Sequence, residues 1–395
     1  MKPAGASFER TAALLLVAAI ALVAFKLLVS QVLFGIAALM WLRIALGDAR
    51  RPALPVFVWP LAAYAVWTVL SALVSVDVRD SVIDLKQLVL FLIVPMTLRL
   101  LRGDRATTAL NVIIAVGAAA ALVGVVQSQV FGYDHLENRP TGFLSHYMTY
   151  SGVLMLVLCA AAARLIFDPG ARAWPGVAVP ALVVALAATL TRNAYVGALV
   201  GIVCLLAARN LKLLLVVPVA ALVFVVAAPQ SYKARAHSIV DLQDPSNRDR
   251  LDMLAMGGDI VRDHPWFGVG PDMVGRVYSQ YVRPDAVHPY NPHLHNVPAQ
   301  IAAERGLPAL LLWLAFIVAA AWGTIRPMRH GQGRERAVAG AGFGAIAAMV
   351  SAGMFEYNFG DSEFLMMFLC LISLPYAVRP TSDAAAIATP ASSGS

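Results

Sequence analysis

The chain is a succession of apolar runs, each roughly twenty residues long, separated by short charged or turn-rich connectors. A helix of about 20 residues spans the roughly 30 Å apolar core of a bilayer. The composition agrees, because 59% of the residues are hydrophobic and only 13% are charged, whereas about a quarter are charged in a soluble domain. The sequence therefore predicts an all-α polytopic membrane protein. About twelve runs are found, near 11–26, 28–46, 53–74, 82–101, 106–130, 143–167, 174–190, 193–208, 211–228, 304–325, 336–355 and 362–379.

The basic residues indicate how these spans are oriented. If the N-terminus is cytoplasmic, the cytoplasmic connectors contain most of the arginines, whereas the short outer connectors contain acidic residues such as Glu356 and Asp361. Cytoplasmic loops are enriched in Lys and Arg, so this pattern predicts that both termini are cytoplasmic. The same rule explains the net charge of +7 without a nucleic-acid partner. The short outer connectors contain only Arg79, Arg139 and Arg192.

One connector is far longer than the others. It covers residues 229–303 and is predicted on the outer face. It separates about nine spans in residues 1–228 from about three spans in residues 304–380. The remaining tail, residues 381–395, is rich in Ala and Ser and is expected to be disordered.

An amphipathic helix is predicted inside the long connector, from Ser246 to Asp263. Ser246 is a suitable N-cap residue, and the dipeptide His264-Pro265 is expected to end the helix. The residues expected on its apolar face, at helical spacing, are Leu251, Leu254, Gly258 and Val261.

The polar segment 282–306 is the strongest candidate for chemistry. It contains His288, His293 and His295 and runs directly into an apolar helix. On an outer loop at a helix start, His295 could accept a proton from a hydroxyl nucleophile near neutral pH. The alternative is that His295 only caps or hydrogen-bonds the loop.

The three histidines could instead bind a metal ion, since imidazole is a common ligand. Their spacing, His-x4-His-x-His, matches no strong metal-binding signature, and Asp285 is the only obvious carboxylate beside them. The cysteines, Cys159, Cys204 and Cys370, all lie in apolar runs, so a thiolate site or a disulfide framework is not expected. The sequence therefore predicts neither a metal nor a cofactor.

Arg192 is the most informative single residue. It lies at a tight outer junction between two apolar runs, where topology disfavours arginine and few acidic residues are near in sequence. An anionic ligand could be its partner, because guanidinium binds phosphate oxygens in a bidentate manner. The alternative is an arginine that reaches lipid phosphates at the membrane surface.

Other basic residues could contribute to the same anion site. Arg248 and Arg250 lie at the start of the amphipathic helix, where the backbone amides also favour anions. Lys86 lies near the outer end of the fourth run and could join them, or could pair with Asp80 or Asp84.

Several short motifs appear together in a fixed order. They are Arg139-Pro140-Thr141-Gly142, Thr191-Arg192-Asn193-Ala194-Tyr195, Arg250, Asp263-His264-Pro265-Trp266-Phe267-Gly268-Val269-Gly270-Pro271, His293-Leu294-His295-Asn296 and Glu304-Arg305-Gly306. With the long outer connector and about twelve spans, they resemble the O-antigen ligase and polymerase superfamily. Thr191-Arg192-Asn193 stands where that superfamily often has Ser-Arg-Gly.

The resemblance implies a membrane glycosyltransferase of GT-C-like architecture, located in the bacterial inner membrane with its active site facing the periplasm. It implies transfer of a glycan from undecaprenyl diphosphate to a sugar hydroxyl of lipid A–core. Arg192 and Arg250 would hold the diphosphate, although Arg248 could align in place of Arg250, and His295 would be the general base. The remaining residues expected to bind substrate are Lys86, Arg139, Arg248, His293, Asn296 and Glu304.

The expected mechanism is an inverting displacement without a metal. Neither an Asp-x-Asp motif in an early outer loop nor a pair of carboxylates of the retaining-glycosidase kind is evident. An O-antigen polymerase and a protein O-oligosaccharyltransferase remain alternatives, because they use the same donor. A transporter is less favoured, because neither an internal repeat nor a series of mid-span ionisable residues is evident.

Overall fold

The computed structural model describes residues 3–47, 54–133, 135–241, 243–284 and 286–378. Within these ranges the fold is entirely helical, and an isolated β-bridge between His135 and Asn138 is the nearest approach to a sheet. The tail that was expected to be disordered lies outside the described residues, as does Asp285. The structure confirms the predicted all-α class.

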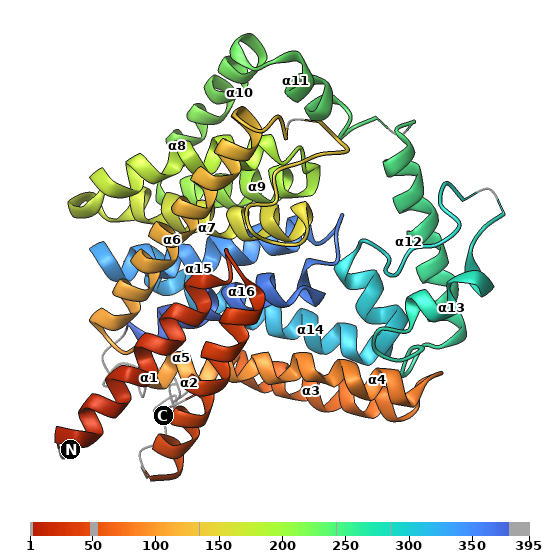
Figure 1. The fold of residues 1–395 in the computed structure, drawn as a ribbon, viewed down its shortest axis with the longest axis horizontal. Helices are drawn as coiled ribbons and strands as arrows, with labels where there is room; N and C mark the ends of the chain where they lie inside the picture. Colours follow the sequence, from red (N-terminus) through yellow and green to blue (C-terminus); the bar gives the residue numbers. More distant parts are fainter. Residues whose placement is uncertain (1–2, 48–53, 134, 242, 285, 379–395) are drawn as a thin grey trace, which may run out of the picture.

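Each predicted apolar run falls on a helical segment. The α-helices are α1 (Pro3–Leu22), α2 (Leu27–Gly47), α3 (Val58–Leu73), α4 (Val78–Asp84), α5 (Ile93–Leu100), α6 (Asp104–Gln129), α7 (Tyr147–Phe167), α8 (Ala173–Ala188), α9 (Arg192–Arg209), α10 (Val216–Ala227), α11 (Gln230–His237), α12 (Pro245–Asp263), α13 (Val274–Tyr281), α14 (Val297–His330), α15 (Gly333–Ala352) and α16 (Ser362–Ala377) (Figure 1). The 3₁₀ helix Leu85–Leu92 joins α4 to α5, so the fourth run is not one regular α-helix.

The helices are long and apolar enough for a polytopic membrane protein. In the described part of the chain, six helical segments have the length and composition to cross a membrane, and four shorter apolar helices accompany them. The number of spans, about twelve, remains a prediction, as does the cytoplasmic location of both termini.

The centre of the bundle is built on small residues. Helix α15 packs against α7 and α9 (Figure 1), and most side chains of α7 are buried. Gly201 of α9 faces the backbone of α15, where an added Cβ would lie 3.1 Å from the Gly344 carbonyl oxygen and 2.6 Å from Cys159 Sγ. Such close approach of helix backbones is typical of membrane interiors, where dispersion contacts replace the hydrophobic effect.

The segment between α10 and α14 lies at one side of the bundle and contains α11, α12 and α13 (Figure 1). The predicted amphipathic helix is present as α12, and it ends at His264 as expected. Its N-cap, however, is Asp244 rather than Ser246: the Asp244 carboxylate accepts hydrogen bonds from the Ser246 and Asn247 amides, and Pro245 occupies the first turn.

The predicted apolar face of α12 was right at Val261, which is partly buried against the core of the outer segment, but wrong at the two leucines. Leu251 and Leu254 are exposed, and the residues that face the protein are instead Asp249, Met253, Met256, Gly257 and Ile260. This face packs against α14 and its preceding loop, where Gly257 leaves room for Leu294. The flexible methionine side chains fill the irregular gaps in this interface, so they are buried in place of the leucines.

Helix α14 is broken at Gly306. It begins at Val297 rather than near residue 304, and Gly306 has φ 80° and ψ 171°, a conformation essentially confined to glycine. The break frees carbonyl groups that must find other donors. The amides of Val269 and Gly270 bind the carbonyls of Ala303 and Glu304 at 2.9 and 2.8 Å. The loop after α12 is thereby fixed to the break in α14.

Substitution of Gly306 tests this junction. An added Cβ would lie 2.0 Å from the Trp266 carbonyl oxygen, and the backbone conformation would be strained. We expect Gly306→Ala to reduce the free energy of unfolding by about 2–4 kcal/mol, measured as a lower Tm in detergent. Gly258→Ala is the matched control, because no atom lies within 4 Å of its added Cβ. A wild-type Tm for Gly306→Ala would contradict the account.

Candidate active site

A cavity of about 470 Å³ lies where six segments of the chain meet. Its walls come from the junction of α4 with the following 3₁₀ helix, the N-termini of α7 and α9, the 272–295 loop, the first turns of α14, and the connector between α15 and α16. Ligand sites are commonly cavities of this size, about 300–1,000 Å³. His293, His295 and Glu304, all predicted from the sequence, line it.

His295 is held in position from both sides. The amide of Leu294 donates to Gln300 Oε1 at 2.6 Å, and Asn296 caps α14 by accepting from the Ala299 amide at 2.9 Å. Asn296 also donates to the Met354 carbonyl at 3.0 Å. His295 itself has φ 48°, uncommon for a residue other than glycine. These contacts make Asn296 a positioning residue rather than a cavity-lining one.

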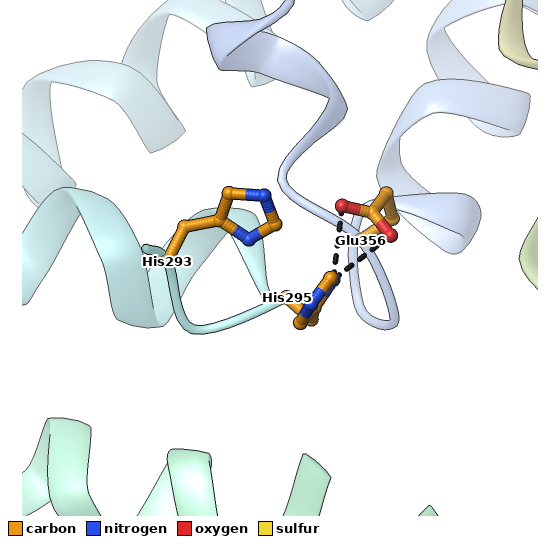
Figure 2. A group of neighbouring side chains, drawn as sticks. All are labelled: His293, His295 and Glu356. Carbon is orange, nitrogen blue, oxygen red and sulfur yellow. Dashed lines mark hydrogen bonds and ion pairs between the residues drawn. The ribbon is translucent and has the colours of Figure 1, made fainter. Parts of the chain in front are cut away.

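Glu356 is the partner of His295. His295 Nδ1 lies 3.0 and 2.9 Å from Glu356 Oε1 and Oε2 (Figure 2). Burial raises the pKa of the Glu356 carboxyl, but the hydrogen bond and charge of His295, together with His293 and Arg250, outweigh burial and hold that pKa below its usual value. A carboxylate at Nδ1 favours the tautomer with its proton there, which leaves the lone pair on Nε2.

His293 lies beside this pair, with its ring centroid 4.3 Å from that of His295 (Figure 2). Burial lowers the pKa of His293, and its buried Nδ1 has no hydrogen-bond partner among the described residues. Ligand atoms of His293, His295 and Glu356 lie within 4.8 Å of one another, so these three residues could hold a metal ion. The alternative based on three histidines is not supported, because His288 Nδ1 instead contacts Asp249 Oδ1 at 3.1 Å.

Arg250 reaches the same connector as Glu356. Its Nε donates to the Phe355 carbonyl at 3.0 Å, and Nη1 donates to Ser246 Oγ at 2.9 Å. Burial lowers the pKa of Arg250, and the charge of Glu356 opposes that change. Arg248 is exposed on the same helix. Of the two arginines, Arg250 is therefore the one directed at the site.

Arg192 has a protein partner, contrary to the expectation from the sequence. Its Nη2 lies 3.1 Å from Asp244 Oδ1, and Nη1 donates to the Ser238 carbonyl at 2.6 Å. Asp244 is distant in sequence but near in space, because α11 and the connector from α11 to α12 return to the start of α9. Burial raises the pKa of Asp244, but Arg192 and the amides of α12 outweigh burial and lower it. The cavity lining includes Asn193 and Ala194 but not Arg192.

Two further arginines lie close to Arg192. Arg139 stacks 4.1 Å over the Tyr147 ring at the cavity rim, and Arg235 Nε donates to the Leu190 carbonyl at 2.9 Å. Burial, then the charges of Arg192 and Arg139, lowers the pKa of Arg235 to about 10. Arg139, Arg192 and Arg235 are called the arginine group below. Three guanidinium groups with one carboxylate, Asp244, would be stabilised by an anion.

Two residues predicted to bind substrate, Lys86 and Glu304, lie in different surroundings from those expected. Lys86 is exposed and does not line the cavity, and its expected partners are engaged elsewhere: Asp80 binds Arg276, and Asp84 lies 3.7 Å from Arg305. Glu304 lines the cavity but binds Arg305 and Gln300, so it supports the wall.

Sequence reasoning missed Glu356, Arg235 and His146. Glu356 was recognised only as an acidic residue on the outer side, and its pairing with His295 could not be predicted across the intervening helices. His146 caps α7, its Nδ1 accepting from the Met148 amide at 3.2 Å, and it lines the cavity. Burial lowers the pKa of His146, an effect that Glu356 and Asp361 oppose.

Two histidines that line the cavity, His293 and His146, predict a dependence of stability on pH. The pKa of His293 is lower in the folded chain than the usual value of about 6.5, so the unfolded chain binds protons more readily and stability is lost as pH falls. We expect Tm in detergent to decrease below about pH 6.5, with a smaller decrease in His293→Asn. Part of the decrease in Tm with falling pH should remain in this variant, because the pKa of His146 is also lowered in the folded chain. His330→Asn, at the far end of α14, is the control, and an unchanged slope in His293→Asn would contradict the assignment.

Comparison with known proteins places the site in a recognised domain. Residues 177–314 match the model of a family described as O-antigen ligase. The match includes Arg192, Arg250, His293 and His295, whereas Lys86, Arg139 and Glu356 lie outside it. No curated protein matches the chain.

Proposed function

We propose that this chain is an O-antigen ligase, because residues 177–314 match the model of a family described as O-antigen ligase, whose members are membrane glycosyltransferase-like enzymes. It transfers a glycan from undecaprenyl diphosphate to a sugar hydroxyl of lipid A–core, at the periplasmic face of the bacterial inner membrane. The observation that carries this proposal is the His295–Glu356 pair, which lines a cavity beside a group of arginines.

His295 acts as the general base. With its Nδ1 proton directed at Glu356, Nε2 is free to accept the proton of the acceptor hydroxyl. The acceptor oxygen then forms a bond to the anomeric carbon while the bond from that carbon to the diphosphate oxygen breaks. Glu356 stabilises the imidazolium that forms, as the acidic member of a catalytic triad does. The proton ends on His295, and the electron pair leaves with undecaprenyl diphosphate.

The arginines stabilise the leaving group. Negative charge grows on the diphosphate as the glycosidic bond breaks, and fixed cations at the edge of a membrane act more strongly there than they would in water. Arg250 lies beside the connector that contains Glu356, and Arg139 and Arg192 lie in the arginine group. Arg192 is tied to Asp244, so its contribution is that of a pre-positioned charge.

The displacement proceeds with inversion, because the hydroxyl attacks from the face opposite the diphosphate. It needs no metal in this proposal, since His295 supplies the base and the arginines supply the positive charge. His293, His295 and Glu356 could nevertheless coordinate a divalent ion, so the test must include a chelator.

The test is transfer in vitro, with purified protein, undecaprenyl-diphosphate glycan and lipid A–core, in the presence of EDTA. We expect wild type to attach the glycan to lipid A–core, and His295→Ala to lose roughly 10²- to 10⁴-fold in rate, the usual contribution of a general base. Glu356→Gln should lose at least about tenfold, because an amide can hold the ring but cannot stabilise imidazolium charge.

The arginine pair on α12 provides a matched control. Arg250→Ala should lose roughly 10²- to 10³-fold in rate, whereas Arg248→Ala should remain near wild type, since its side chain is exposed. Gel filtration and Tm establish that each variant is folded.

Other outcomes lead to other functions. Elongation of the donor glycan without transfer to lipid A–core would indicate a polymerase, and transfer to Ser or Thr of an added protein acceptor would indicate a protein O-oligosaccharyltransferase. Loss of wild-type transfer in EDTA, restored by a divalent ion, would show that the histidines bind a metal instead of acting as a base.

A further inference from the structure

Acidic and basic side chains near His295 are separated: the acidic ones line the cavity and the arginines lie outside its lining. The cavity is lined by five carboxylates, and the described lining residues include neither Lys nor Arg; the carboxylates are Asp84, Asp272, Glu304, Glu356 and Asp361. The arginine group and Arg250 lie outside that lining. A diphosphate would be repelled by the cavity and attracted to the arginines, so the cavity remains for a ligand of different chemistry.

Four of the five carboxylates have partners within the protein. Arg305 lies between two of them: its Nη1 is 2.5 Å from Glu304 Oε2, and its Nη2 is 3.7 Å from Asp84 Oδ2. Asp361 caps α16 and accepts a hydrogen bond from Thr149. Glu356 holds His295, as described above. These four groups are therefore engaged in holding the walls of the site.

Asp272 is the exception. Among the described residues, neither an ion pair nor a hydrogen bond holds its carboxylate. It follows Gly270-Pro271 with φ 60°, a strained backbone conformation that places it at the wall of the cavity. Burial and the charge of Asp84 raise its pKa, while the charges of Arg305 and Lys86 oppose them. A cationic group in the cavity would relieve this unpaired charge.

Asn358 provides a second, independent observation. It lines the cavity and is only 6% exposed, yet neither its side-chain nitrogen nor its oxygen has a hydrogen-bond partner among the described residues. A buried amide without hydrogen-bond partners is destabilising, so such a group points to a ligand. Because an amide both donates and accepts, it suits hydroxyl groups, which do the same.

We propose that this cavity is the acceptor subsite and that it takes a sugar unit carrying a protonated amine, with Asn358 binding its hydroxyls and Asp272 binding the ammonium group. This inference rests on the proposed glycosyl transfer and specifies its acceptor. The acceptor approaches His295 from the carboxylate side, while the lipid diphosphate binds on the arginine side. The division of charge thus prevents either substrate from occupying the other's position.

The test is equilibrium binding of two simple glycosides to the purified chain, measured by calorimetry in detergent at mildly acid pH. Decyl glucosaminide carries the amine, and decyl glucoside has an uncharged hydroxyl group of similar size at the same carbon. We expect wild type to bind the amine roughly tenfold more tightly, the effect of one charge-assisted hydrogen bond. Asp272→Asn should abolish the preference, and asparagine tolerates the positive φ at this position.

Two further variants complete the design. Asp259→Asn makes the same change of charge on the exposed face of α12, where Asp259 pairs with Arg262, and should retain the preference. Asn358→Leu should weaken the binding of both glycosides by a similar factor, since it removes contacts to their hydroxyl groups. Equal binding of the two glycosides, absence of binding by either, or an undiminished preference in Asp272→Asn would overturn the inference.

The His295→Ala variant separates this inference from the proposed function. If His295→Ala keeps the amine preference and loses transfer, both proposals are supported. If it keeps the preference and transfers at the wild-type rate, the cavity binds the amine sugar but the proposed base is wrong.

Discussion

The break in α14 at Gly306 is the constraint on which the site depends. In a membrane helix, an unpaired carbonyl costs several kcal/mol, so a break can persist only where other groups supply donors. Here the loop after α12 supplies them, through the amides of Val269 and Gly270. From α3, Trp67 Nε1 donates to the Arg305 carbonyl at 3.0 Å. The outer segment is therefore anchored to the bundle by backbone hydrogen bonds rather than by side chains alone.

This anchoring explains how a long connector can hold catalytic geometry. The first turns of α14 fix His295 through Gln300 and Asn296, and the connector between α15 and α16 brings Glu356 to its ring. Helix α12, packed on α14, brings Arg250 to the same connector. His295, Glu356 and Arg250 thus come from three separate elements that meet at one place in the fold. The carboxylates line the cavity, whereas the arginine group and Arg250 lie outside its lining.

The sequence was sufficient for the features that depend on local composition. Apolar runs predicted the helices, and the concentration of polar residues in the long connector and in segment 282–306 predicted where the site would be. His295 was selected because a histidine at a helix start is chemically distinctive, whereas Arg250 was assigned from the family resemblance, with Arg248 left as an alternative. The predicted role of each as base or as cation remains a proposal.

The sequence was insufficient to predict side-chain partners and buried faces that depend on packing between residues far apart in the chain. Asp244 pairs with Arg192 only because the connector from α11 to α12 returns to the start of α9, and Glu356 meets His295 only through the packing of α14 and α15. The apolar face of α12 was assigned to Leu251 and Leu254, although Met253 and Met256 are buried instead. Leucine exposed on an outer helix and methionine inside it cannot be distinguished by periodicity alone.

The most direct test of the central claim is chemical rescue of the base. In His295→Gly, the cavity should admit free imidazole, which can accept the acceptor proton in place of the missing ring. The account predicts that imidazole restores glycan transfer to His295→Gly in a concentration-dependent manner and does not restore it to Arg250→Ala. Transfer by His295→Gly at the wild-type rate without imidazole, or equal stimulation of both variants, would contradict it.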